Sequence, residues 1–163
     1  MILNMVKIYQ KGISVIEILV ASAILSIALV GIMGLIAFSL QISTLVKETT
    51  QANFIAQETI EATRNFRDGT DWTTNGIGIL AMNAAYHLEK TADNPPKWTL
   101  VQDEESINGF SRKVIFQNVN RDANYNIVAT GGTNDPDTKK ATTTVSWKNK
   151  KVEIITYITN WRR

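Results

Sequence analysis

The sequence predicts an α+β protein in which one long N-terminal helix is packed by a C-terminal antiparallel β-sheet head. Three observations predict it. An apolar run fills residues 18–40, an amphipathic helical pattern follows it without a turn signal, and strand-like segments dominate after residue 84. The predicted parts are a cytoplasmic leader (1–12), a membrane-length helix (13–40), an amphipathic helix (41–68) and an extracytoplasmic head (69–163).

Only serines and two glycines interrupt the aliphatic side chains of the apolar run. At about 1.5 Å per residue, some 20 such residues cross the hydrocarbon core of a bilayer. Lipid offers no hydrogen-bond partners, so the run must be helical, and its serines are expected to bond to carbonyls one turn earlier. The helix is expected to be least stable at Gly31 and Gly34, because glycine lowers helix stability by roughly 1 kcal/mol relative to alanine.

Basic residues precede this run. Lys7 and Lys11 lie before Gly12 with no acidic residue among them, which favours a cytoplasmic N-terminus and a head outside. An ordinary signal peptide is an alternative, because residues 21–23 read Ala-Ser-Ala. The apolar stretch before that site is only about eight residues long and contains Glu17, which disfavours it. A plain membrane anchor with Glu17 at the bilayer edge is a second alternative.

Composition excludes several function classes. The net charge is +2, but the chain after Gly12 carries equal numbers of basic and acidic side chains, so charge does not indicate nucleic-acid binding. Cysteine is absent and histidine occurs once, at His87. Disulfides, thiolate metal sites and histidine-based catalytic triads are therefore not expected. We predict a structural protein, not an enzyme, with no cofactor and no metal.

The order of the N-terminal parts is informative. The sequence KGISVIE at residues 11–17, directly before the apolar run, resembles the class III signal of type IV prepilins and pseudopilins. The resemblance implies that a prepilin peptidase cuts after Gly12 and methylates the new N-terminus at Ile13, and that Glu17 acts in assembly and register. Ile13 stands where the family most often has phenylalanine, and the run lacks the proline of many major pilins.

The same resemblance implies the partners and the location. The partners are the peptidase and methyltransferase, other pilin subunits, the inner-membrane assembly machinery and, before assembly, membrane lipid. The protein would move from the cytoplasmic membrane to a surface pilus or pseudopilus. Residues 53–68 are similar to the helix end of PilV-type minor prepilins, and residues 157–162 resemble their closing strand, which favours a minor subunit. The carboxylate of Glu17 costs about 2.5–3.5 kcal/mol in lipid, and the ammonium of Ile13 would offset it.

Apolar or small residues continue the helix at spacings of three and four. They are Ile42, Leu45, Val46, Thr49, Ala52, Ile55, Ala56, Thr59, Ile60, Thr63 and Phe66. The first clear stop is Asp68-Gly69, so one helix of roughly 80 Å is predicted over about residues 13–67. A loop or partly helical connector (69–84) is expected next, with Ile77, Ile79, Leu80 and Met82 seated on the head.

Six strands are predicted in the head, at residues 85–90, 97–102, 110–118, 125–130, 141–147 and 152–159. In the fifth strand, Ala141, Thr143, Val145 and Trp147 share one face. The fifth and sixth strands should form a hairpin. His87 is expected to be an ordinary strand residue.

Three polar clusters were weighed as sites. The run Asp103-Glu104-Glu105 is interpreted as a solvated turn and not as a catalytic pair. Residues 134–137, with Asp135 and Asp137, carry calcium-type oxygen ligands but lack a closing glutamate, so a turn is preferred over a calcium site. A weaker alternative is a surface for single-stranded DNA. It would comprise Lys148, Lys150, Lys151, Arg162, Arg163, Trp147 and Trp161.

The sequence thus predicts a subunit of a type IV pilus or of a related secretion or DNA-uptake filament. An uncleaved, membrane-anchored adhesion or ligand-binding domain is the alternative, and a hydrolase head is a distant third.

Overall fold

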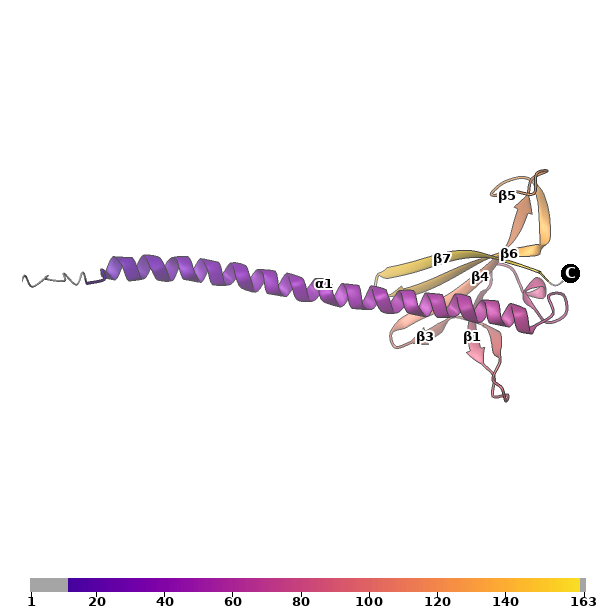
Figure 1. Cartoon of the computed structure of the whole chain (residues 1–163), viewed down its shortest axis with the longest axis horizontal. Helices are drawn as coiled ribbons and strands as arrows, with labels where there is room; N and C mark the ends of the chain where they lie inside the picture. Colours follow the sequence, from indigo (N-terminus) through magenta and orange to yellow (C-terminus); the bar gives the residue numbers. More distant parts are fainter. Residues whose placement is uncertain (1–11, 162–163) are drawn as a thin grey trace, which may run out of the picture. The chain divides into compact units, whose positions relative to one another are not determined.

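The computed structural model describes residues 12–161. One helix, α1 (Val15–Gly69), precedes a short 3-10 helix, η1 (Ile77–Ile79), and a head of strands (Figure 1). The strands are β1 (Ala85–Lys90), β2 (Trp98–Gln102), β3 (Glu105–Ile107), β4 (Phe110–Arg121), β5 (Ile127–Val128), β6 (Thr133–Trp147) and β7 (Lys150–Thr159). The predicted α+β architecture is confirmed. The chain divides into two compact units, Met1–Val46 and Lys47–Arg163.

In the first unit, α1 is apolar on every side. It is the one described helix that is long and apolar enough to cross a membrane. The Ser22 hydroxyl donates to the carbonyl of Leu19 at 2.9 Å, and the Ser26 hydroxyl donates to that of Ser22 at 2.8 Å. The predicted bonds are therefore present for Ser22 and Ser26. The helix runs without a break through Gly31 and Gly34.

In the second unit, one face of α1 is buried. Its buried residues are Ala52, Ile55, Ala56, Thr59, Ile60, Ala62, Thr63 and Phe66. The hydroxyls of Thr59 and Thr63 donate to the carbonyls of Ile55 and Thr59, at 2.8 and 2.7 Å, so these polar residues are satisfied within the helix. The predicted apolar face is thus confirmed from Ala52 onward. Ile42 and Val46, which the pattern included, are exposed.

The sheet is antiparallel, with the strand order β2-β1-β4-β6-β7, and β3 and β5 also pair with β4. Its inner face forms two apolar clusters with α1. The larger cluster contains Phe66, Trp72, Ile77, Leu88 and Phe116, among others. The smaller one contains Ala52, Ile55, Ala56, Phe110, Val145 and Trp147. The predicted face of β6 is confirmed, and so is its hairpin with β7.

A register shift divides the β4–β6 pair. Asn118 lies opposite Lys139, but the next residue, Val119, lies opposite Asp135. Three residues of β6 therefore bulge out, and Pro136, which has no N–H to donate, is one of them. The carbonyl of Pro136 accepts a bond from the Trp72 indole at 3.2 Å. Beyond the bulge, the ends of β4 and β6 project with β5 from the rest of the sheet (Figure 1).

Several predicted elements need correction. The strand predicted at 125–130 is wrong, because only Ile127–Val128 pairs. The Asp122 carboxylate accepts bonds from the backbone N–H groups of Asn124 and Asn126, at 2.9 and 2.8 Å, and closes a turn there. The turn predicted at 134–137 is also wrong, since these residues belong to β6. Strand β3 was not predicted. Ile79 is exposed, whereas Ile77 is fully buried.

Candidate processing site and head clusters

The predicted cleavage site lies just before α1. Gly12, Ile13 and Ser14 have no regular structure, and Ile13 is 73% exposed. A side chain added at Gly12 would meet no atom within 4 Å. The carbonyl of Ser14 accepts the N–H groups of Glu17 and Ile18, at 3.0 and 3.3 Å, and so begins the helix. The Gly12–Ile13 peptide bond is therefore accessible. Lys7 and Lys11 lie outside the described residues.

Glu17 occupies the first turn of α1, where the free N–H groups of the helix favour a negative charge. It is exposed, and it is the only charged side chain in the sequence between Gly12 and Val46. Its neighbours Ile16 and Ile18 are exposed and apolar. The arrangement places one carboxylate at the start of a surface that otherwise suits lipid or other apolar helices.

In the head, the predicted solvated acidic turn is wrong for Glu105, which belongs to β3 and is half-buried, whereas Asp103 and Glu104 are exposed outside the strands. The carboxylate of Glu105 lies 2.6 Å from the Arg112 guanidinium, which is 5% exposed. Arg112 also donates to the carbonyl of Leu88 at 3.0 Å and lies 3.7 Å from Glu58 of α1. The Ser111 hydroxyl and Lys113 bond to Glu104 and lower the pKa of its carboxyl group. This cluster joins α1, β1, β3 and β4, so its role is structural.

His87 is buried in β1, as predicted for a strand residue. Its Nδ1 lies 3.3 Å from the Asp103 carbonyl oxygen, and its Nε2 lies 3.0 Å from the Glu89 carboxylate. Burial lowers the pKa of His87, but the hydrogen bonds with Glu89 and Asp103 and the nearby charge of Glu105 outweigh burial and raise it. Both oxygens are acceptors, so these contacts stabilise the doubly protonated imidazole relative to the neutral one.

The candidate calcium ligands are engaged by protein groups. The Arg121 guanidinium lies 2.6 Å from the Asp135 carboxylate, whose other oxygen accepts the N–H of Asp137 at 3.0 Å. Burial raises the pKa of Asp135, but the bonds from Arg121 and Thr138 prevail and lower it. Within residues 12–161, no cluster of three or more His, Cys, Asp or Glu side chains could hold a metal ion.

The candidate DNA-binding residues do not form one surface. Trp147 is buried against Phe110, with ring centroids 5.6 Å apart. Trp161 follows β7, whereas Trp147 pairs with Lys150 at the start of that strand, so the two indoles lie at opposite ends of the hairpin. Lys148 and Lys151 pair with Glu48 and Glu153, at 2.6 and 3.2 Å. Arg162 and Arg163 lie outside the described residues.

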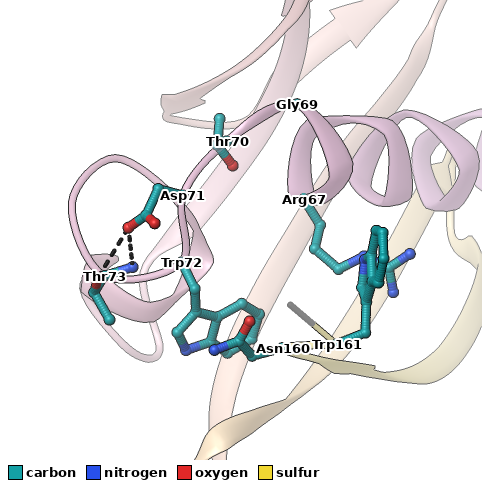
Figure 2. A pocket seen from close by; sticks show the side chains of 8 residues that line it. All are labelled: Arg67, Gly69, Thr70, Asp71, Trp72, Thr73, Asn160 and Trp161. Carbon is teal, nitrogen blue, oxygen red and sulfur yellow. Dashed lines mark hydrogen bonds between the residues drawn. The ribbon is translucent and has the colours of Figure 1, made fainter. Parts of the chain in front are cut away.

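A cavity of about 340 Å³ lies at the C-terminal end of α1 (Figure 2). Its lining consists of Arg67, Gly69, Thr70, Asp71, Trp72, Thr73, Asn160 and Trp161. Sequence reasoning missed it, although the spacing Asp71-x-Thr73-Thr74 is the pattern of a side-chain-capped turn. One oxygen of Asp71 accepts both the N–H and the hydroxyl of Thr73 and of Thr74.

These bonds, first of all that from the Thr73 hydroxyl, lower the pKa of Asp71. A carboxylate so engaged is a poor general base. The lining residues Arg67 and Trp161 both donate to the carboxylate of Asp68, at 2.8 and 3.1 Å. The polar groups of this cavity therefore shape the loop that ends α1.

The comparisons agree with the N-terminal geometry. Residues 7–33 match the family described as the prokaryotic N-terminal methylation motif. No curated protein and no solved structure matches the chain. The motif is a structural, pilin-type one and not that of an enzyme family. It implies processing by a prepilin peptidase and pilin-type assembly partners in general. The chain thus carries a type IV pilin-like class III signal on an apolar helix that fits membrane anchoring.

Proposed function

We propose that the chain is a structural subunit, made as a prepilin, of a type IV pilus or of a related secretion or DNA-uptake filament. One observation carries the proposal. The methylation motif at residues 7–33 spans Gly12, Ile13 and Glu17 together with the start of a helix that is exposed over residues 15–44 and apolar there apart from Glu17 and a few uncharged polar side chains. A soluble domain has no use for such a surface, whereas a membrane or a bundle of like helices covers it.

In this proposal the peptidase cuts the exposed bond after Gly12 and the new amino group of Ile13 is methylated. Methylation leaves that amine positively charged at neutral pH. The Glu17 carboxylate then has a cationic partner one turn away or in an adjacent subunit. A carboxylate costs about 2.5–3.5 kcal/mol in hydrocarbon, so a pair that forms only when helices are in register selects that register.

The remaining parts follow from this role. Residues 1–12 are the cytoplasmic leader, residues 13–40 span the membrane and later form the filament core, and residues 41–68 continue into the head. The head, residues 69–163, lies outside. The absence of cysteine and the resemblance of residues 53–68 to PilV-type helices favour a minor subunit. Other pilins and the inner-membrane assembly machinery are the proposed partners.

The decisive experiment is mass spectrometry of the N-terminal peptide, after expression with and without a prepilin peptidase. With the peptidase, the mature chain should begin at methylated Ile13. A Gly12→Val variant should keep its leader under the same conditions, because the added side chain crowds the cleaved bond. An intact leader in the wild-type protein beside an active peptidase would contradict the proposal and favour an uncleaved anchor.

A further inference from the structure

Lys139, on β6, is a buried lysine. The residue is 5% exposed, although lysine is almost never fully buried unless it is paired with an opposite charge. Within residues 12–161, no carboxylate forms an ion pair with its ammonium group. The ammonium group donates instead to the side-chain oxygen of Asn118, a neutral group, at 2.8 Å. A buried charge whose nearest acceptor is neutral is costly, so this pair of residues needs an explanation.

The sheet holds these two side chains against each other. Asn118 and Lys139 are direct cross-strand partners, and they form the last pair of β4 and β6 before the register shifts. Directly opposite residues project from the same face of a sheet, with their Cβ atoms about 4.5–5.5 Å apart. On the other side, Lys139 lies opposite Ile158 of β7, which is 1% exposed. The backbone therefore presents the amine of Lys139 to the carboxamide of Asn118.

The surroundings of Lys139 favour its reactive form. Burial lowers the pKa of Lys139, and the charges of Asp135 and Asp137 oppose this shift without cancelling it. A lower pKa increases the fraction of neutral amine, which is the form whose lone pair can attack a carbonyl carbon. The same two carboxylates are close enough to act on the Lys139 charge, and a carboxylate beside an amine can carry a proton from one nitrogen to another. The amine thus has both an electrophile and proton carriers nearby.

We propose that Lys139 and Asn118 join in a covalent amide bond between β6 and β4. The Nζ lone pair attacks Cγ of Asn118, a C–N bond forms, and the electron pair of the carbonyl group moves to Oδ1. A proton released by Nζ passes to Nδ2. The carbonyl group then re-forms, the Cγ–Nδ2 bond breaks, and ammonia leaves. The reaction needs no oxidant, reductant or second substrate.

The bond accounts for the burial of Lys139 and secures the sheet. An amide is uncharged, so its formation removes the buried ammonium charge. Asn118 is exposed, which gives the released ammonia a direct path to solvent. The bond closes residues 118–139, including β5, into a covalent loop exactly where the β4–β6 register changes. A closed loop has less freedom in the unfolded chain, so the two strands are harder to separate. This inference goes beyond the filament role and does not depend on it.

Mass spectrometry of the full chain tests the bond. The folded chain should weigh about 17 Da less than its sequence requires, which is the mass of the ammonia released. Trypsin cuts after Arg121 and Lys140 but not after a lysine whose amine is acylated. Residues 114–121 and 122–140 should therefore appear in the digest as one linked species. These peptides lie in the head, so the measurement is the same whether or not the leader has been removed.

Matched variants check the chemistry. Lys139→Arg keeps a positive donor but cannot form the amide, so its chain should have the full mass and give two separate peptides. Asn118→Ala removes the attacked carbon and should give the same result, which covers the case that Lys139→Arg does not fold. Lys140→Arg, on the outer face of β6, should keep the linked species. Circular dichroism confirms that each chain is folded. A folded wild-type chain that keeps its full mass after long incubation at mildly alkaline pH, or a linked species in Asn118→Ala, would overturn the proposal.

Discussion

The indole N–H of Trp147 donates to the carboxylate of Glu48 at 3.1 Å and joins the β6–β7 turn to α1 across 99 residues of sequence. The Lys148 ammonium lies 2.6 Å from the other oxygen of Glu48. The bond from Lys148 lowers the pKa of Glu48, burial opposes this shift, and the bond from Trp147 adds to it. One carboxylate thus holds both the buried ring and the exposed lysine of the turn.

Acid should release this contact. A carboxyl group whose pKa is lowered on folding stabilises the fold above its ordinary pKa, here 4.5, and loses that contribution as pH falls through the lower value in the folded state. We expect the Tm of the full chain in detergent to fall between about pH 5 and about pH 3. A Glu48→Gln variant, which cannot titrate, should lose less of its Tm over that interval. The same acid dependence in both proteins would contradict this role of Glu48.

Arg112 should be the most sensitive charged residue of the head. Replacing it with methionine keeps the aliphatic packing but leaves Glu105 and the Leu88 carbonyl without their donor. The expected loss of unfolding free energy is about 1.5–3 kcal/mol, the range for hydrogen bonds to charged groups. Denaturant unfolding of the full chain measures it. Lys113→Met, on the exposed side of the same strand, is the control and should cost less than about 1 kcal/mol.

The only imidazole in the chain offers a direct pKa measurement. We expect NMR titration of His87 to give a pKa above 6.5, because the bonds with Glu89 and Asp103 outweigh burial. A raised histidine pKa stabilises the fold below 6.5, and this contribution is lost as pH rises through the folded value. Glu89→Gln should move the titration to lower pH. A midpoint at or below 6.5 in the wild-type protein would show that burial prevails.

Replacing the buried, unpaired hydroxyl of Thr143 should stabilise the head. It is fully buried between α1 and the sheet, and its hydroxyl is the one buried side-chain polar atom in residues 12–161 that has no hydrogen-bond partner. Valine has nearly the same shape and removes the unpaired group, so Thr143→Val should gain about 1 kcal/mol. Thr142→Val, half-buried on the outer face, is the control and should change little. A loss of stability in Thr143→Val would indicate that the hydroxyl is satisfied in solution.

Substitution of Glu17 should impair assembly but not processing. In the proposed mechanism, Glu17→Ala and Glu17→Gln chains are still cut after Gly12 but enter filaments poorly, because the Ile13 amine has no carboxylate partner. Quantitative immunoblots of membrane and sheared-filament fractions measure both steps. Normal incorporation of either variant would sink the pairing hypothesis.

Most of the fold could be predicted from periodicity. The helix, the hairpin of the last two strands and the inner face of β6 follow from local spacing of apolar residues, which needs no knowledge of the rest of the chain. Strand β3 and the long start of β6 were missed because Glu105 and Asp135 are acidic and Pro136 disfavours strands. Their partners Arg112 and Arg121 lie on β4, and only the folded sheet brings them together.

The candidate processing site, unlike these strands, could be predicted from local sequence alone. Gly12, Ile13 and Glu17 lie within six residues of one another, so their relation is local and the sequence displays it directly. The capped loop at Asp71 and the cavity beside Trp72 depend on Trp161, nearly ninety residues away, and no spacing rule connects them.

The bulge at Pro136 separates two registers of the β4–β6 strand pair. Asn118 pairs with Lys139 and Val119 pairs with Asp135, so the register of β4 with β6 differs on the two sides of the bulge. An insertion or deletion in the loop beyond Val119 therefore does not change which side chains of β4 and β6 face α1. Residues 120–134 can therefore diverge in length and composition while the helix-packing face stays fixed. The bulge gives the head a region in which surface properties can change between related proteins without refolding the domain.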